Sequence, residues 1–118
     1  MNHDDKRTLF VCFQNLDTIC DVLKDNPSSS TQYIAPMEQH LATIMELRSE
    51  FVMPNPIPRN AEMFDRLTSS VKLLVEEFKQ IESLMQGPDT SLVLERCNRI
   101  PVKCESIRQT MIRLRPMA

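Results

Sequence analysis

The chain has 118 residues, of which 42% are hydrophobic and 25% charged, and its formal net charge is −2. These values are typical of a globular protein, and the length suits one domain over residues 1–118 with a single core. The charge balance gives no general attraction to nucleic acid or to an anionic membrane. The apolar runs, such as Leu9–Phe13, are too short for a membrane span, and we expect neither a secretory signal nor membrane association. A cytoplasmic or nuclear location is therefore expected.

Glycine usage is the strongest indicator of fold class. Gly87 is the only glycine, whereas the tight turns of β structure depend on glycine. Tryptophan is absent and tyrosine occurs once, which also disfavours a sheet. The composition therefore predicts an all-α protein.

The first predicted helix covers residues 4–24. Apolar side chains recur there at steps of three and four residues, and Asp4 and Asp5 suit the positive end of a helix dipole. The segment Asp25–Ser30 contains proline and serines and is expected to end the helix. The side chains expected in the core are Leu9, Cys12, Phe13, Leu16, Ile19, Cys20 and Leu23.

The second predicted helix covers residues 31–52, and Pro36 predicts that its first turn is distorted. Its apolar face consists of Ile34, Met37, Leu41, Ile44, Leu47 and Phe51. Residues 53–59 then alternate proline with other residues. Because proline fixes φ and disfavours helix in the preceding residue, we expect 53–59 to form an extended strap across one end of the fold.

The third predicted helix covers residues 60–86 and has the most regular spacing. Asn60 suits the N-cap position. Gly87 is expected just beyond the helix with a positive φ, and Pro88 prevents continuation. The apolar face consists of Phe64, Leu67, Val71, Leu74, Phe78, Ile81 and Met85.

The fourth predicted helix covers residues 90–114. Pro101 cannot donate to the carbonyl of Cys97, which predicts a kink near Cys97. Four helices of similar length with short connectors favour an antiparallel four-helix bundle with up-down-up-down topology. The three-and-four spacing favours left-handed, coiled-coil-like packing. The apolar face of this helix consists of Val93, Cys97, Ile100, Cys104, Ile107, Met111 and Leu114.

All four cysteines lie on these apolar faces, and none has the Cys-x-x-Cys spacing of a zinc or redox motif. We expect buried free thiols that act as small hydrophobic side chains. Disulfides between helices, formed in an oxidising compartment, are the alternative.

The sequence offers few groups for catalysis or cofactor binding. His3 and His40 are the only histidines, and no Ser/His/Asp arrangement or glycine-rich phosphate loop can be formed. No Glu-x-x-His motif occurs, and no glutamate falls at the centre of a predicted core stripe. We expect no enzyme activity, no cofactor and no metal site. His40 with Met37 leaves a ligand or haem carrier as a third hypothesis for function.

Charge is distributed unevenly along the chain. Residues 91–118 carry 6 basic and 2 acidic side chains, whereas residues 1–90 carry 8 and 14. Either the basic side chains of the fourth helix pair with acids on neighbouring helices, or they form a docking surface for an acidic partner. The basic side chains are Arg96, Arg99 and Lys103 on one side of the apolar face, and Arg108 and Arg115 on the other. The candidate acidic partners are Asp17, Asp21, Glu76 and Glu82.

Several apolar side chains lie off the core stripes: Phe10, Val11, Leu73, Val75, Leu94 and Val102. Either the core is wide, or a second face buries against another protein.

We interpret the chain as a non-enzymatic protein–protein interaction module, either an adaptor domain or a small subunit of a larger helical assembly. The expected contacts are Phe10 and Val11 for apolar anchoring, with Arg96, Arg99 and Lys103 for charge, and the expected partner is a helical or acidic protein. A nucleic-acid-associated regulatory domain that uses the basic fourth helix is the alternative. The sequence leaves the oligomeric state and the identity of the partner open.

Overall fold

A computed structural model describes residues 1–53 and 57–117 of the chain. Every regular element over those ranges is helical, which confirms the all-α prediction. The elements in chain order are α1 (His3–Asp25), the 3₁₀ helix η1 (Pro27–Tyr33), α2 (Ile34–Val52), α3 (Pro58–Met85), α4 (Thr90–Cys97), α5 (Ile100–Leu114) and the 3₁₀ helix η2 (Arg115–Met117).

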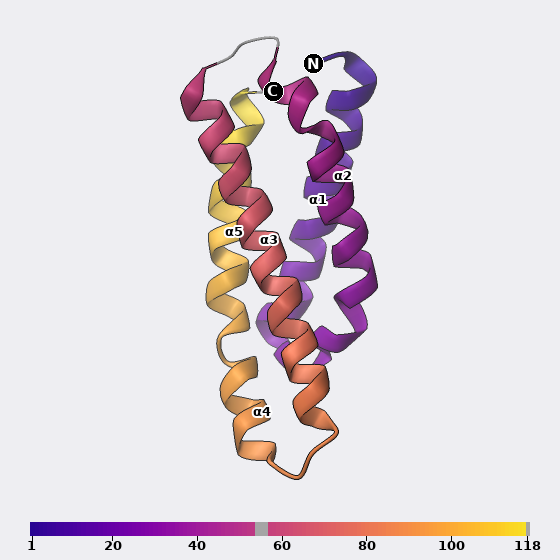
Figure 1. The fold of residues 1–118 in the computed structure, drawn as a ribbon, viewed down its shortest axis with the longest axis vertical. Helices are drawn as coiled ribbons and strands as arrows, with labels where there is room; N and C mark the ends of the chain where they lie inside the picture. Colours follow the sequence, from indigo (N-terminus) through magenta and orange to yellow (C-terminus); the bar gives the residue numbers. More distant parts are fainter. Residues whose placement is uncertain (54–56, 118) are drawn as a thin grey trace.

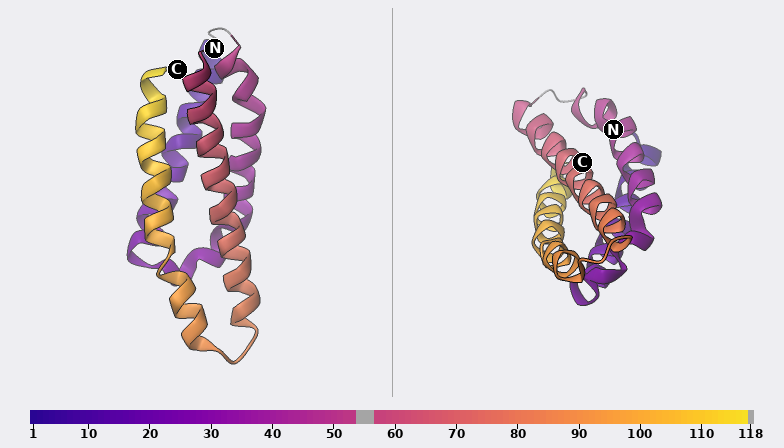
Figure 2. Two further views of the ribbon diagram at one scale, coloured as in Figure 1. Left: turned by 60° about the vertical axis from the view of Figure 1, so that its left-hand side comes forward. Right: turned by 60° about the horizontal axis from the view of Figure 1, so that its bottom comes forward.

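The long helices form an antiparallel four-helix bundle (Figure 1). Helices α1 and α3 lie diagonally opposite, and each packs against both α2 and α5. The molecule is a rod of 51 × 23 × 21 Å. Helix α1 begins and η2 ends at the same end of this rod, whereas the α3/α4 hairpin extends beyond η1 at the other end (Figures 1 and 2). None of the helices described is long and apolar enough to cross a membrane.

The core is built from the predicted apolar stripes, except that Met85 at the end of α3 is 54% exposed. In α1 the buried residues are the seven that the spacing predicts. Asn2 caps this helix, because its side-chain oxygen accepts a hydrogen bond of 2.8 Å from the backbone N–H of Asp5. Phe13, Phe64 and Phe78 are among the largest fully buried side chains. Burial of each such ring stabilises the fold by about 1.5–3 kcal/mol.

The start of the third helix differs from the prediction. Helix α3 begins at Pro58 after Ile57 as N-cap, and the backbone N–H of Asn60 already bonds to the carbonyl of Ile57 at 2.9 Å. Asn60 is therefore inside the helix and not its cap. Proline is well suited to the first helical position, where no N–H is needed. Of the predicted strap, residues 54–56 lie outside the described residues. Ile57 is extended as predicted, but Met53 is the helical C-cap of α2, and Pro58 and Arg59 belong to α3.

The expected positive φ at Gly87 is wrong. Helix α3 ends instead by tightening, because the N–H groups of Gln86 and Gly87 bond to the carbonyls three residues earlier, those of Ser83 and Leu84. These bonds satisfy the last carbonyls without a left-handed residue, so glycine is not required by the backbone conformation.

The kink expected near Cys97 divides the fourth predicted helix in two, although Asn98 and Arg99 keep right-handed helical dihedral angles. Helix α4 ends at Cys97 and α5 begins at Ile100, with Asn98 and Arg99 between them and Pro101 in the first turn of α5. Helix α2 likewise starts later than predicted, since residues 27–33 form η1. Both breaks place a proline in a first turn, where its missing N–H is not needed.

We expect Gly87→Ala to raise the free energy of unfolding by about 0.4–1 kcal/mol, because alanine restricts the unfolded chain more than glycine does. An added Cβ at residue 87 would meet the carbonyl oxygen of Leu84 at 3.6 Å, an ordinary van der Waals contact. Urea unfolding followed by circular dichroism measures the change.

The control is Ala42→Gly at an exposed position inside α2, which is expected to lower stability by roughly 0.5–1 kcal/mol. A loss of stability in the Gly87→Ala variant would mean that residue 87 requires a left-handed backbone after all.

Candidate functional site

The two apolar residues predicted to anchor a partner lie together on α1. Phe10 is half-buried against the core, and its ring centroid lies 6.4 Å from that of Phe13. Val11 is 49% exposed. Both line a surface hollow of about 340 Å³, whose remaining walls are His3, Lys6, Arg7 and Gln14. The hollow therefore combines an apolar floor with a cationic rim.

The cations of this rim are available for a ligand. Neither Lys6 nor Arg7 forms an ion pair within the part of the chain that the structure describes. Sequence reasoning placed the basic rim on the fourth helix and missed these two residues. Their spacing was the available signal, because Lys6 and Arg7 precede Phe10 and Val11 by one helical turn.

A second hollow of about 480 Å³ continues along the seam between α1 and α5. It shares Phe10 and Gln14 with the first, and its other walls are Asp17 and Arg115. Arg115 lies 3.0 Å from Oδ2 of Asp17. The two hollows thus form one surface, which we call the Phe10 groove.

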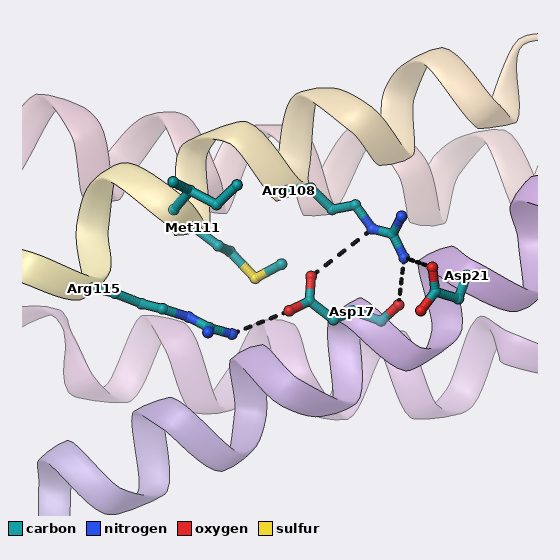
Figure 3. Close-up of a pocket in the computed structure, with 6 residues that line it drawn as sticks. Asp17, Asp21, Arg108, Met111 and Arg115 are labelled. Atoms are coloured by element: carbon teal, nitrogen blue, oxygen red, sulfur yellow. Dashed lines mark hydrogen bonds and ion pairs between the residues drawn. The ribbon is translucent and has the colours of Figure 1, made fainter.

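Below the Phe10 groove, charged side chains tie α1 to α5 (Figure 3). The guanidinium of Arg108 donates to the backbone carbonyl of Asp17 at 2.8 Å and also to the carboxylate of Asp21. Its Nε lies 3.8 Å from Oδ1 of Asp17. These contacts agree with the alternative in which Arg108 and Arg115 pair with Asp17 and Asp21.

The structure does not bring Phe10 and Val11 together with the predicted basic stripe. Arg96 lies on α4 at the far end of the bundle. Arg99 follows α4, and its guanidinium lies 3.5 Å from Glu95 of the preceding turn. Lys103 lies on α5 near the level of Cys20, which is about 15 Å along α1 from Phe10. The five predicted residues therefore do not form one surface.

Arg96 has a buried partner that the sequence did not predict. Glu77 on α3 is only 7% exposed, and its Oε2 lies 3.7 Å from the Nη1 of Arg96. The same nitrogen donates to Gln80 Oε1 at 2.6 Å. Glu77 lies beside the predicted core stripe and not at its centre, but contact with α4 widens the buried face of α3 enough to bury it.

The cysteines are free and buried, as expected. The thiol of Cys12 donates to the carbonyl of His40 at 3.7 Å.

Burial lowers the pKa of the His40 side chain. Across residues 1–53 and 57–117, no group of three or more His, Cys, Asp or Glu side chains is arranged to hold a metal ion.

Comparison with known proteins adds no relative. No family model matches the chain, and no curated protein or solved structure is significantly similar to it.

Removal of the Arg96 cation should destabilise the fold through Glu77. We expect Arg96→Met to lower the free energy of unfolding by about 1–3 kcal/mol, because a buried acceptor loses its charged partner. The double variant Glu77→Leu/Arg96→Met should recover part of this loss, since an apolar pair has no charge to desolvate. Chemical denaturation of the wild-type chain, the two single variants and the double variant measures the coupling free energy between residues 77 and 96.

Arg99→Met is the matched control. Its ion pair with Glu95 lies within an exposed segment, so a change of no more than about 0.5 kcal/mol is expected. Additive losses in the double variant would contradict an energetic link between Glu77 and Arg96.

Proposed function

We propose that this chain is a protein–protein interaction module that binds an acidic amphipathic helix of its partner in the Phe10 groove. The observation that carries the proposal is the apolar hollow at Phe10 and Val11, bordered by Lys6 and Arg7. All residues that line this hollow lie on α1, the helix whose buried residues match the sequence prediction completely.

The apolar floor suits an anchor side chain from a partner. Phe10 is held by its contacts with the core and with Phe13, so binding would immobilise little additional side-chain freedom there. Val11 is 49% exposed and gains burial when a partner covers it. Apolar contact at the centre with charge at the edge is the usual organisation of a protein interface.

The charge of the rim selects the partner. Lys6 and Arg7 are the cations nearest the floor, and no carboxylate lines that hollow. Opposite charge on a partner accelerates association, whereas like charge is repelled and disfavours binding. An acidic flank therefore fits this rim, whereas a basic flank would face like charges.

The shape of the groove favours a helix as the occupant. Its walls follow α1 from His3 to Asp17, a length of about 21 Å. An amphipathic helix laid along such a path presents apolar side chains at steps of three and four residues. About four turns would span the groove.

The ion pairs of the C-terminal helices weaken the nucleic-acid alternative. Arg96, Arg108 and Arg115 each lie within 4.0 Å of a carboxylate, which a phosphate would have to displace. Binding of phosphate backbones depends on cations that are free to release their counterions. The protein-binding proposal uses Lys6 and Arg7 instead.

A displayed library of amphipathic helical peptides with either sign of charge tests the proposal. The full chain should enrich acidic helices, and binding should fall at least tenfold in Val11→Asp and in Arg7→Glu, because the first places charge on the apolar floor and the second reverses the rim. Fluorescence anisotropy of an enriched peptide measures the affinities.

The matched control is Val102→Asp on α5, at a residue 74% exposed and outside the Phe10 groove. It should bind the enriched peptide as the wild-type chain does. Enrichment of basic peptides, or equal weakening by Val11→Asp and Val102→Asp, would contradict the proposal.

A further inference from the structure

Two of the four cysteines meet across the seam that joins the first long helix to the last. Cys20 lies on α1 and Cys104 on α5, and both side chains line the same hollow on the seam between these two helices. Cys20 is fully buried and Cys104 is 3% exposed. The packing of α1 on α5 thus brings two cysteines separated by 83 residues of chain to the same place on the seam.

The pair lies directly beneath a hollow in the surface. A surface hollow of about 290 Å³ on the α1/α5 seam is lined by both cysteines, and its other walls include Lys24, Pro101 and Arg108. A small oxidant in this hollow would lie next to the Cys104 side chain, with Lys24 and Arg108 among the neighbouring groups and Glu105 also in the wall. Cations next to a thiol favour the thiolate, which is the reactive form.

The environment of Cys104 differs from that of the other cysteines. The neighbouring Cys20 thiol lowers the pKa of Cys104, burial opposes this, and the Arg108 guanidinium lowers it further. The Cys104 thiol and burial raise the pKa of Cys20. Both directions favour Cys104 as the thiol that loses its proton first.

Cys12 and Cys97 lack these features. Burial raises the pKa of Cys12 to about 11. Burial and the nearby Glu77 carboxylate raise the pKa of Cys97. Neither is hydrogen-bonded to another thiol in the described structure, so these two cysteines serve as internal references for ordinary buried thiols.

We propose that Cys20 and Cys104 form an oxidisable dithiol site, which a peroxide or a low-molecular-weight disulfide converts into a covalent bond between α1 and α5. This inference is independent of the proposed function, because it concerns a different part of the seam and no partner.

With hydrogen peroxide as oxidant, the Cys104 thiolate attacks one oxygen, the O–O bond breaks, and Cys104 becomes a sulfenic acid as hydroxide leaves. The Cys20 sulfur then attacks the Cys104 sulfur, the S–O bond breaks, and the oxygen leaves as water with the protons released by the two thiols. Overall two thiols and one peroxide give one disulfide and two waters.

The linkage would close a long loop between the first and last long helices. Because a disulfide restricts the unfolded chain more as the loop lengthens, oxidation should raise the Tm by about 5 °C or more. A thiol reductant should reverse the shift.

The test uses the full chain and the variant Cys12→Ala/Cys97→Ala, which keeps only the proposed pair. After treatment with dilute hydrogen peroxide, intact-mass spectrometry should show the loss of two hydrogen atoms in both proteins. Trypsin should then release residues 8–24 joined to residues 104–108. Alkylation of the wild-type chain after unfolding should label Cys12 and Cys97 and spare Cys20 and Cys104.

The control Cys104→Ala, which retains three cysteines, should form no intramolecular disulfide under the same conditions. Oxidation of Cys104 to sulfinic acid without a linkage, a linkage from residues 8–24 to residues 97–99, or full alkylation of all four cysteines after treatment would each overturn the proposal. A disulfide that leaves the Tm unchanged would overturn its stabilising role.

Discussion

The packing of α1 against α5 is the contact on which the rest of the molecule depends. It joins the first and last long helices and turns a succession of helices into a closed ring of four. The Phe10 groove, the ion pairs around Arg108 and the Cys20–Cys104 contact all lie along this one seam. The ion pairs around Arg108 and the meeting of Cys20 with Cys104 join residues far apart in sequence, so these two features form only once α1 and α5 have packed together.

Local periodicity was sufficient to predict the helices and most of the core. The seven buried residues of α1 follow directly from their three-and-four spacing, because one face of a helix must be buried in a bundle. The same rule was less successful for α3, because contacts with two neighbouring helices widen the face of α3 that is buried. Glu77 and Val75 are buried on α3 because α3 also contacts α4 and α2 respectively, and a single-helix pattern carries no record of such neighbours.

The site was predicted only in part for a related reason. Phe10 and Val11 lie off the core stripe of one helix, so the partial burial of Phe10 and the exposure of Val11 could be anticipated from that helix alone. The cations that lie beside these two residues depend on the axial register of the packed helices. The register of the antiparallel helices places Arg115 beside Asp17 and carries Arg96 to the far end, and the spacing of the sequence does not encode that register.

Helix ends were the other source of error. Asn60 and Gly87 both have the chemistry of helix caps, yet Pro58 starts α3 earlier and 3₁₀-type hydrogen bonds end it without a left-handed residue. A residue type favours a cap position without requiring it, because several arrangements satisfy the same terminal N–H and carbonyl groups.

The placement of the first and last helices at a common pole has a further consequence for protein engineering. Because α1 starts and η2 finishes there, a short linker from residue 117 to residue 1 would make the backbone circular without disturbing the helices. New ends could then be opened in the turn between Met85 and Thr90, at the opposite pole. The permuted protein would keep every helix and every helix–helix contact. A protein or label fused to the new termini would lie at the other tip of a 51 Å rod, far from the Phe10 groove.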